Sequence, residues 1–251
     1  MLAYDRQQAI LAYLRQHHSA SVTELSQKYF ISETSIRRDL QKLERTGLIR
    51  KTYGGAVIVQ GDNEVIALEA RQQMEREAKM TIARKAVKLV QNGDVIFLDS
   101  SSTVLAMVPF LSELNSLSVI TNGLRIANAL TEYPQFKVYV LGGLLNARTF
   151  SMRGALTLQM LGNMRANLAF LSPKGLDLCG NVYCADEEEA AARQMMMNLS
   201  DRSILLCSLK KMGQHAAFRL CGLEKIQTVL CEAAPDPEWQ QLFSQREVSL
   251  L

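Results

Sequence analysis

Residues 32–56 read SETSIRRDLQKLERTGLIRKTYGGA, and this stretch decides the fold of the amino-terminal part of the chain. Ser32 suits an N-cap, because a serine oxygen can accept a hydrogen bond from the free amides of a helix's first turn. Apolar residues at helical spacing follow. At about 100° per residue, Ile36, Leu40 and Leu43 share one narrow side of this helix. We therefore expect a helix with a single buried face.

The opposite face of the helix is polar and basic. It carries side chains that point away from the apolar side or flank it: Thr34, Arg37, Arg38, Gln41, Lys42 and Arg45. Arg and Gln read base edges in the major groove of DNA, while neighbouring cations bind phosphates. The pattern favours a DNA-reading helix, although a solvated basic helix would look the same.

Two shorter helices are expected before this one. Residues 6–16 have helical periodicity, and a second helix is expected to begin at Ser21 or Val22 and to end before Phe30. The third helix is expected to end at Gly47. Three short helices within about 40 residues are typical of helix-turn-helix modules.

A two-stranded hairpin is expected to close this module. Residues 48–52 and 56–59 predict two strands around Tyr53-Gly54-Gly55, where glycine permits the positive φ of a tight turn. The whole unit is then a winged helix-turn-helix. Arg50 and Lys51 on the wing would contact the DNA backbone, adding affinity with little sequence information.

Composition agrees with a small basic module attached to a larger neutral one. The 251-residue chain is 48% hydrophobic and 21% charged, which excludes a disordered or fibrous protein. Residues 1–60 hold nine Lys and Arg against five Asp and Glu, while the whole chain carries only +3. This asymmetry suits nucleic-acid binding, and a solvated basic surface would give the same count.

The chain is expected to be cytoplasmic and to stay out of membranes. Its apolar runs, such as Val95–Leu98, fall far short of the roughly 20 residues of a membrane-spanning helix. Residues 1–8 lack the apolar segment of a signal peptide. The five cysteines are odd in number and have no CxxC spacing, so we expect free thiols.

We expect a winged helix-turn-helix domain over residues 1–58, a linker over 59–76 and a larger domain over 77–251. The linker region is polar, and helical periodicity resumes over residues 68–80. The larger domain contains six apolar runs of strand length, at residues 95–98, 117–120, 136–141, 167–171, 203–207 and 228–231. Helical segments are expected between several of them, at 104–111, 124–131, 155–164 and 187–199. This alternation predicts an α/β fold with a largely parallel sheet covered on both faces.

Polar residues and glycines follow three successive strands. Ligands of open α/β sheets collect at the carboxyl ends of strands. The first strand leads into Asp99-Ser100-Ser101-Ser102-Thr103 and a helix start, which together offer hydroxyls and amides to an anion. Thr121-Asn122-Gly123 follow the second strand, and Gly142-Gly143, which permit close approach of a ligand or of another loop, follow the third. Each pattern also suits caps and turns, but their coincidence indicates an anion site.

Two lysines lie in loops after later strands. Lys174 and Lys211 could neutralise a phosphate as point charges or remain solvated. The acidic run Asp186–Glu189 opens a predicted helix, where helix capping explains it better than metal binding. Because the chain has no P-loop, dinucleotide fingerprint or zinc spacing, we expect no metal and no cofactor.

These motifs give the chain a resemblance to a known family. Residues 22–55, VTELSQKYFISETSIRRDLQKLERTGLIRKTYGG, closely resemble the DNA-binding domain of DeoR-type bacterial transcriptional regulators. The remainder resembles their sugar-phosphate sensor domain, which is similar to ribose-phosphate isomerase reduced to a binding role. The resemblance covers the chain from about Arg6 to Cys231.

The resemblance implies a repressor of a carbohydrate or polyol operon that binds operator double-stranded DNA and is released by a phosphorylated sugar or polyol. With the residues identified above, the candidate DNA contacts are Ser32, Thr34, Ser35, Arg37, Arg38, Gln41, Lys42, Arg45, Arg50, Lys51 and Tyr53. The candidate effector contacts are Lys79, Asp99, Ser100, Ser101, Ser102, Thr103, Thr121, Asn122, Gly142, Gly143, Lys174 and Lys211. Lys79 enters through the resemblance alone. An activator would use the same reading helix, so that alternative stays open.

The chain departs from the family pattern at several effector-side positions. Ser101 stands where glycine is usual, and the acidic residue expected at Ser208 is missing. Pro173, Lys174 and Cys184 replace small or hydroxylated residues. These departures leave the DNA-binding motif unchanged.

An enzyme is the alternative from another class, namely an isomerase-like catalyst with a fused DNA-binding module. Asp99 and Asp177 are its best acid or base candidates, because proton abstraction from a sugar needs a carboxylate. No second group that would tune either carboxylate is evident, so we expect no catalysis. A winged module reads one half-site, so we expect a homo-oligomer, a dimer or tetramer, formed through the larger domain.

Overall fold

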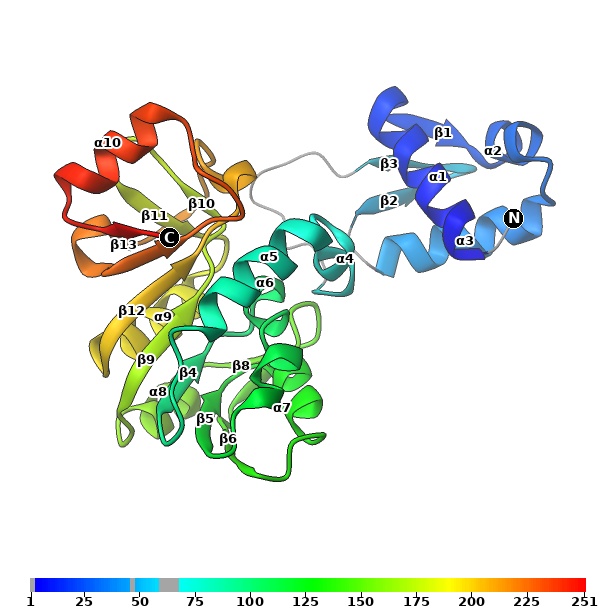
Figure 1. The fold of residues 1–251 in the computed structure, drawn as a ribbon. Coiled ribbons are helices and arrows are strands. Elements are labelled where there is room, and N and C mark those ends of the chain that lie inside the picture. The colour runs from blue at the N-terminus through cyan, green and yellow to red at the C-terminus, as the bar shows by residue number, and fades with distance from the viewer. Residues whose placement is uncertain (1–2, 46–47, 59–67) are drawn as a thin grey trace. The chain divides into compact units, whose positions relative to one another are not determined.

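The computed structural model describes residues 3–45, 48–58 and 68–251 of the chain. They belong to two compact units, Met1–Arg71 and Gln72–Leu251 (Figure 1). Each unit has its own hydrophobic core, and each is described by itself.

The first unit contains the three expected helices, which are α1 (Ala3–His17), α2 (Val22–Tyr29) and α3 (Glu33–Arg45). Ser21 caps α2, because its hydroxyl accepts from the amide of Glu24 while the Glu24 carboxylate accepts from the amide of Ser21. At the start of α3, Ser32 Oγ lies 3.4 Å from the amide nitrogen of Ser35. One core receives side chains from all three helices, among them Ile10, Leu14, Leu25, Ile36 and Leu40.

The expected two-stranded hairpin is confirmed, and a third strand that the sequence does not indicate joins it in a three-stranded sheet. β2 (Ile49–Thr52) pairs antiparallel with β3 (Gly55–Ile58), and β1 (Ser19–Ser21) pairs with the other edge of β3. A strand of three residues is too short to show the alternation by which strands are recognised, so the sequence predicts a turn there. Gly55 is needed at this crossing, because a Cβ would lie 2.3 Å from the carbonyl oxygen of Ala20.

The connection between the units is only partly described. Several expected boundaries lie outside the described residues, namely Gly47, Val59 and the linker segment 59–67. The helix expected over residues 68–80 is in fact two helices, α4 (Leu68–Gln73) and α5 (Arg76–Val87). The break falls at Glu75, whose φ of 53° is left-handed and cannot continue an α-helix.

The second unit is built on a seven-stranded sheet in the order β15-β14-β12-β9-β4-β5-β6. Its strands are β4 (Val95–Leu98), β5 (Leu117–Thr121), β6 (Phe136–Val140), β9 (Ala166–Leu171), β12 (Ser200–Leu206), β14 (Thr228–Leu230) and β15 (Ser249–Leu250). All neighbouring strands in this sheet are parallel. The six strands expected from sequence are therefore confirmed, together with the parallel α/β class.

Both faces of this sheet are buried. Along β4, Phe97 joins one core, whereas Ile96 and Leu98 join the other, as expected for alternating side chains. One face is covered by α5, α6 (Ser102–Leu105) and α7 (Leu124–Leu130). The other face is covered by α8 (Ala155–Leu161), α9 (Glu187–Asn198) and α10 (Pro237–Gln245).

Some elements differ from the expectation. The helix expected over residues 104–111 is interrupted, because α6 ends at Leu105 and a separate 3-10 turn (Val108–Glu113) contains Pro109, which has no amide proton to continue an α-helix. Six short strands of the second unit were not foreseen. One is β15 at the edge of the main sheet, and the others form two accessory sheets: β7 (Leu144–Asn146) with β8 (Ser151–Arg153), and β10 (Gly175–Leu176), β11 (Asn181–Cys184) and β13 (Phe218–Gly222). Among the described residues, no helix has the length and apolar character needed to cross a bilayer. The five cysteines are free thiols, as expected.

Candidate DNA-binding surface and effector site

The two faces of α3 differ as the sequence predicts. Ile36 and Leu40 are fully buried and Leu43 nearly so. The candidate DNA contacts on the other side are exposed, with Ser35 half-buried: Ser32, Thr34, Arg37, Arg38, Gln41 and Lys42. The side chain of Arg45 lies outside the described part of the structure.

The cations on this face are not equivalent. Arg37 Nη2 lies 3.2 Å from Glu33 Oε2, and Glu33 also accepts a hydrogen bond from the hydroxyl of Thr23. The bonds from Thr23 and Arg37 lower the pKa of the Glu33 carboxyl. Arg38 and Lys42 have no ion pair with any residue that the structure describes. These two cations are therefore the ones most available to an external anion.

A buried carboxylate fixes the orientation of α3. Asp39 is 2% exposed and pairs with Arg6 of α1, while Gln7 donates a second hydrogen bond to it at 2.9 Å. The hydrogen bond to Asp39 raises the pKa of Arg6. Sequence reasoning missed this contact, because Asp39 lies among charged residues that resemble a solvated face. The pair joins α1 to α3 and so fixes which side of α3 is turned outward.

The wing presents its candidate residues to solvent. Arg50, Lys51 and Tyr53 are exposed, and Tyr53 lies fully exposed at the turn beside Gly54, whose φ is 92°. The backbone amide of Lys51 donates to the carboxylate of Glu44 at 2.9 Å, which fixes the wing against α3. The wing is therefore held against α3 within the first unit.

In the second unit, Asp99 anchors the loop that follows β4. It is buried, and its carboxylate accepts from the amides of Ser101 (2.8 Å) and Ser172 (2.9 Å) and from Arg193 Nε (2.8 Å). Arg193 is also buried, and although desolvation opposes its charge, Asp99 raises its pKa. Asp99 therefore orders the loop through three hydrogen bonds.

The remaining residues of this loop are buried together. Ser100, Ser102 and Thr103 are each at most 6% exposed. The hydroxyl of Ser101 caps α6 by accepting from the amide of Val104 at 3.2 Å. The hydroxyl that stands where glycine was expected is thus used within the fold.

Ser172, at the end of β9, joins the loop to Lys211. Lys211 Nζ donates to Ser172 Oγ at 2.7 Å, and that hydroxyl in turn donates to the carbonyl oxygen of Leu206 at 2.6 Å. Since the Ser172 amide donates to Asp99, one residue connects two of the predicted site residues. Sequence reasoning missed Ser172, although its place directly after a buried strand was the available signal.

Two polar side chains lie at the end of β5. The hydroxyl of Thr121 is hydrogen-bonded within the fold, whereas Asn122 has one polar atom without a partner among the described residues. Thr121 Oγ1 donates to the carbonyl oxygen of Leu98 at 2.7 Å and accepts from the amide of Gly123. Asn122 is buried, and its Nδ2 donates to the carbonyl oxygen of Met152, whereas its Oδ1 has no partner among the described residues. A buried acceptor without a donor is costly, so Asn122 is a candidate for a ligand hydroxyl.

Of the two glycines after β6, Gly143 is required by the fold. A Cβ at Gly143, whose φ is 145°, would lie 2.2 Å from Thr157 Oγ1 and 2.6 Å from the carbonyl oxygen of Arg153. Thr157 also donates to the carbonyl oxygen of Gly142 at 2.7 Å. The close approach predicted from sequence is therefore made by another segment of the chain.

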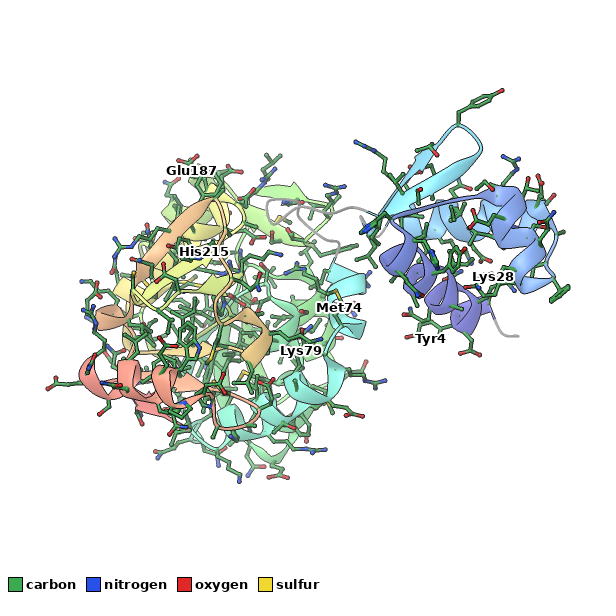
Figure 2. The ribbon with its side chains drawn as sticks, turned by 90° about the horizontal axis from the view of Figure 1, so that it is seen from above. Tyr4, Lys28, Met74, Lys79, Glu187 and His215 are labelled. Atoms are coloured by element: carbon green, nitrogen blue, oxygen red, sulfur yellow. The ribbon has the colours of Figure 1, made fainter. Side chains whose placement is uncertain are left out.

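Lys79 and Lys174, the other two predicted lysines, each donate a hydrogen bond to a backbone carbonyl oxygen. Lys79 is buried on α5 and donates to the carbonyl oxygen of Met74 at 2.6 Å (Figure 2). Lys174 is half-buried, and its backbone amide donates to the carbonyl oxygen of Tyr183.

The acidic run at the start of α9 has the capping role that the sequence favours. The side chain of Asp186 accepts from the amide of Glu189 at 3.0 Å. Glu189 Oε2 lies 3.4 Å from Arg193 Nη1, so this turn also supports the buried arginine. Sequence reasoning missed Arg193, although a single arginine among the alanines and methionines of α9 was a usable signal.

The second carboxylate considered for catalysis, Asp177, is also engaged. It accepts from the hydroxyl of Tyr183 at 2.6 Å and from the amide of Asn181 at 2.8 Å. Burial alone would raise the pKa of Asp177, but these hydrogen bonds outweigh burial and lower it. A carboxylate with a lowered pKa is a weak general base.

Comparison with known proteins places both units in one family. Residues 6–61 match the DeoR-like helix-turn-helix domain, and residues 74–233 match the DeoR C terminal sensor domain. Ribose 5-phosphate isomerase A from Methanocaldococcus jannaschii is 16% identical over 55% of this chain and 54% of that chain, with a TM-score of 0.41.

Similar curated proteins match nearly the whole length of the chain. The L-fucose operon activator of Haemophilus influenzae is 32% identical over 97% of this chain and 97% of its own. The transcriptional regulator GolR of Listeria innocua is 31% identical over 92% of this chain and 91% of its own. The glycerol-3-phosphate regulon repressor of Escherichia coli is 26% identical over 98% of this chain and 97% of its own. This chain therefore belongs to the DeoR family of helix-turn-helix transcriptional regulators.

Proposed function

We propose that this regulator represses a carbohydrate or polyol operon and is released from its operator by a phosphorylated sugar or polyol. The observation that carries the DNA-binding part is the outward face of α3, where Arg38 and Lys42 are exposed opposite a buried apolar side. Phosphate contacts by such cations position a reading helix, and neighbouring polar side chains supply base contacts.

The proposed effector site lies at the carboxyl ends of β4, β5, β9 and β12. Lys211 would neutralise the phosphate, and the buried Oδ1 of Asn122 would accept from a sugar hydroxyl. The loop hydroxyls of Ser100, Ser102 and Thr103 are further candidate contacts. Relatives named for the L-fucose operon and the glycerol-3-phosphate regulon support this class of effector.

We propose binding without catalysis. Asp99 is engaged by Arg193 and two backbone amides, and Asp177 by Tyr183 and Asn181, so neither carboxylate is placed to abstract a proton. The proposal needs no cofactor or metal.

We further propose that the protein acts in the cytoplasm as a dimer or tetramer formed through its second unit. A single winged module reads one half-site, so symmetric operator recognition requires at least two copies. Exposed apolar side chains at the β6 edge and on β7 are compatible with self-association: Tyr139, Val140, Leu144 and Leu145.

Activation is the second candidate function, because the Haemophilus influenzae relative is named an activator. Transcription in vitro from a promoter carrying the selected DNA site separates the two. Added protein should lower transcript yield if it represses and raise it if it activates.

The decisive experiment has two arms on the full-length protein. Selection from random duplex DNA should enrich one half-site motif, and Arg38→Ala should reduce the enrichment while Lys88→Ala, in the second unit, should not. Thermal-shift measurements with phosphorylated sugars and polyols, against the same compounds without phosphate, should show stabilisation by phosphorylated compounds only. Absence of any enriched motif would refute the DNA-binding role. Turnover of a sugar phosphate would favour the enzyme.

A further inference from the structure

Glu75 lies at a strained position near the start of the second unit. Its φ of 53° and ψ of 40° are left-handed, which is uncommon for a residue other than glycine and persists only where surrounding contacts enforce it. Its side chain is 18% exposed. The residue follows α4 and precedes α5, four positions from Arg71, the last residue of the first unit.

The carboxylate of Glu75 is bound by the turn that follows β12. Ser208 Oγ donates to Glu75 Oε2 at 2.8 Å, and Lys210 Nζ lies 3.5 Å from Glu75 Oε1. The two partners are 133 and 135 positions away in the sequence, so the contact closes a long loop of chain. In this contact the hydroxyl of Ser208 is the hydrogen-bond donor and the carboxylate of Glu75 is the acceptor.

The same turn reaches the proposed effector site on its other side. The amide of Lys211 donates to the carbonyl oxygen of Ser208 at 2.9 Å, which makes the turn one short rigid piece. Lys211 Nζ donates to Ser172 Oγ, and the Ser172 amide donates to Asp99. Hydrogen bonds therefore run without a gap from Glu75 through the turn to the Asp99 loop.

We propose that Glu75 is a positioning residue that couples the effector site to the segment leading to the DNA-binding unit. An anion bound by Lys211 competes with Ser172 for the ammonium group, which shifts the turn, weakens its hold on Glu75 and frees the start of α5. This inference rests on the proposed function for its anionic ligand. Coupling through a contiguous network requires that a change at either end be felt at the other.

Hydrogen exchange of the full-length protein, without DNA or ligand, tests the coupling. The variants are Glu75→Gln at one end and Lys211→Met at the other. The matched control is Glu77→Gln, because Glu77 is exposed in the first turn of α5 and its side chain has no hydrogen bond or ion pair with a described residue. Exchange is measured in peptides covering residues 72–80, which contain Glu75, and residues 99–105, which contain the Asp99 loop. These are the two ends of the hydrogen-bond network.

Each of the two variants should speed exchange about fivefold at both ends, because Glu75→Gln weakens a charge-assisted hydrogen bond and Lys211→Met removes one, and Glu77→Gln should change neither. If Glu75→Gln affects only residues 72–80, or Lys211→Met only residues 99–105, Glu75 is a local anchor and the proposal is overturned. Should a variant fail to fold, Ser208→Ala removes only the hydroxyl and should reproduce the Glu75→Gln pattern. Because no DNA or effector is added, failure here leaves the proposed function standing, and failure of the proposed function leaves the measured coupling intact.

Discussion

Arg193 Nε lies 2.8 Å from Asp99 Oδ2, and this ion pair joins α9 to the loop that follows β4. The two side chains are 6% and 2% exposed, so water cannot replace either partner. Every predicted effector residue in the loop depends on the position of Asp99. The pair is therefore a structural prerequisite for the site.

Arg193→Met should destabilise the second unit by about 3–5 kcal/mol, because it leaves the Asp99 carboxylate buried without its cation. Urea unfolding followed by circular dichroism measures the change. The control is Arg165→Met, which removes an exposed pair with Asp201 and should cost less than about 1 kcal/mol. If both substitutions lowered the free energy of unfolding equally, burial of the Arg193–Asp99 pair would not explain the cost of Arg193→Met.

Gly143→Ala should destabilise the protein, whereas Gly142→Ala should be nearly neutral. A Cβ at Gly143 overlaps Thr157 and the backbone of Arg153, while a Cβ at Gly142 meets only Met160 Sδ at 3.4 Å. The loss at Gly143 is expected to exceed about 2 kcal/mol, and Tm falls about 2–4 °C for each kcal/mol in a domain of this size. Matching melting curves for the two variants would show that the loop adapts.

Asp177→Asn should lower the free energy of unfolding at pH 7, and the difference from the wild type should shrink in acid. Hydrogen bonds outweigh burial and lower the folded-state pKa of Asp177. The stabilisation is therefore present above the unfolded pKa of about 4 and is lost as pH falls through the lower folded pKa. Urea titrations between pH 7 and pH 3 test this; a pH-independent difference would argue against it.

Lys51→Ala should reduce the slope of log affinity against log salt by about one, if Lys51 contacts one phosphate. Arg38→Ala should instead reduce the preference for the selected site over bulk DNA by about 1–3 kcal/mol. Fluorescence anisotropy from 50 to 300 mM salt separates the two effects. An unchanged slope for Lys51→Ala would exclude the wing from the interface.

Much of the fold could be predicted from periodicity. The apolar stripe of Ile36, Leu40 and Leu43 is enough to orient α3, and the six long apolar runs are enough for the parallel sheet. Short elements could not be predicted. β1 and β10 have three and two residues, and their pairing is decided by contacts with distant segments.

The candidate site was harder to predict, because a hydroxyl that bonds the backbone looks the same in sequence as one that binds a ligand. Thr121 follows its strand just as Asn122 does, yet only Asn122 keeps an unpartnered polar atom. Asp99 was correctly placed at the strand end, but its carboxylate proves to be occupied by Arg193, a residue 94 positions away. Long-range partners of this kind leave no local pattern.

Ser172 has a consequence for the variation the chain can tolerate. Its side chain must accept from Lys211 and donate to Leu206 within a space where the residue is 2% exposed. Alanine satisfies neither demand, and a longer polar side chain would have to displace the buried neighbours of Ser172. A saturation library at codon 172, sorted for operator-linked reporter output, should return serine almost alone, while codon 174 nearby should accept many residues.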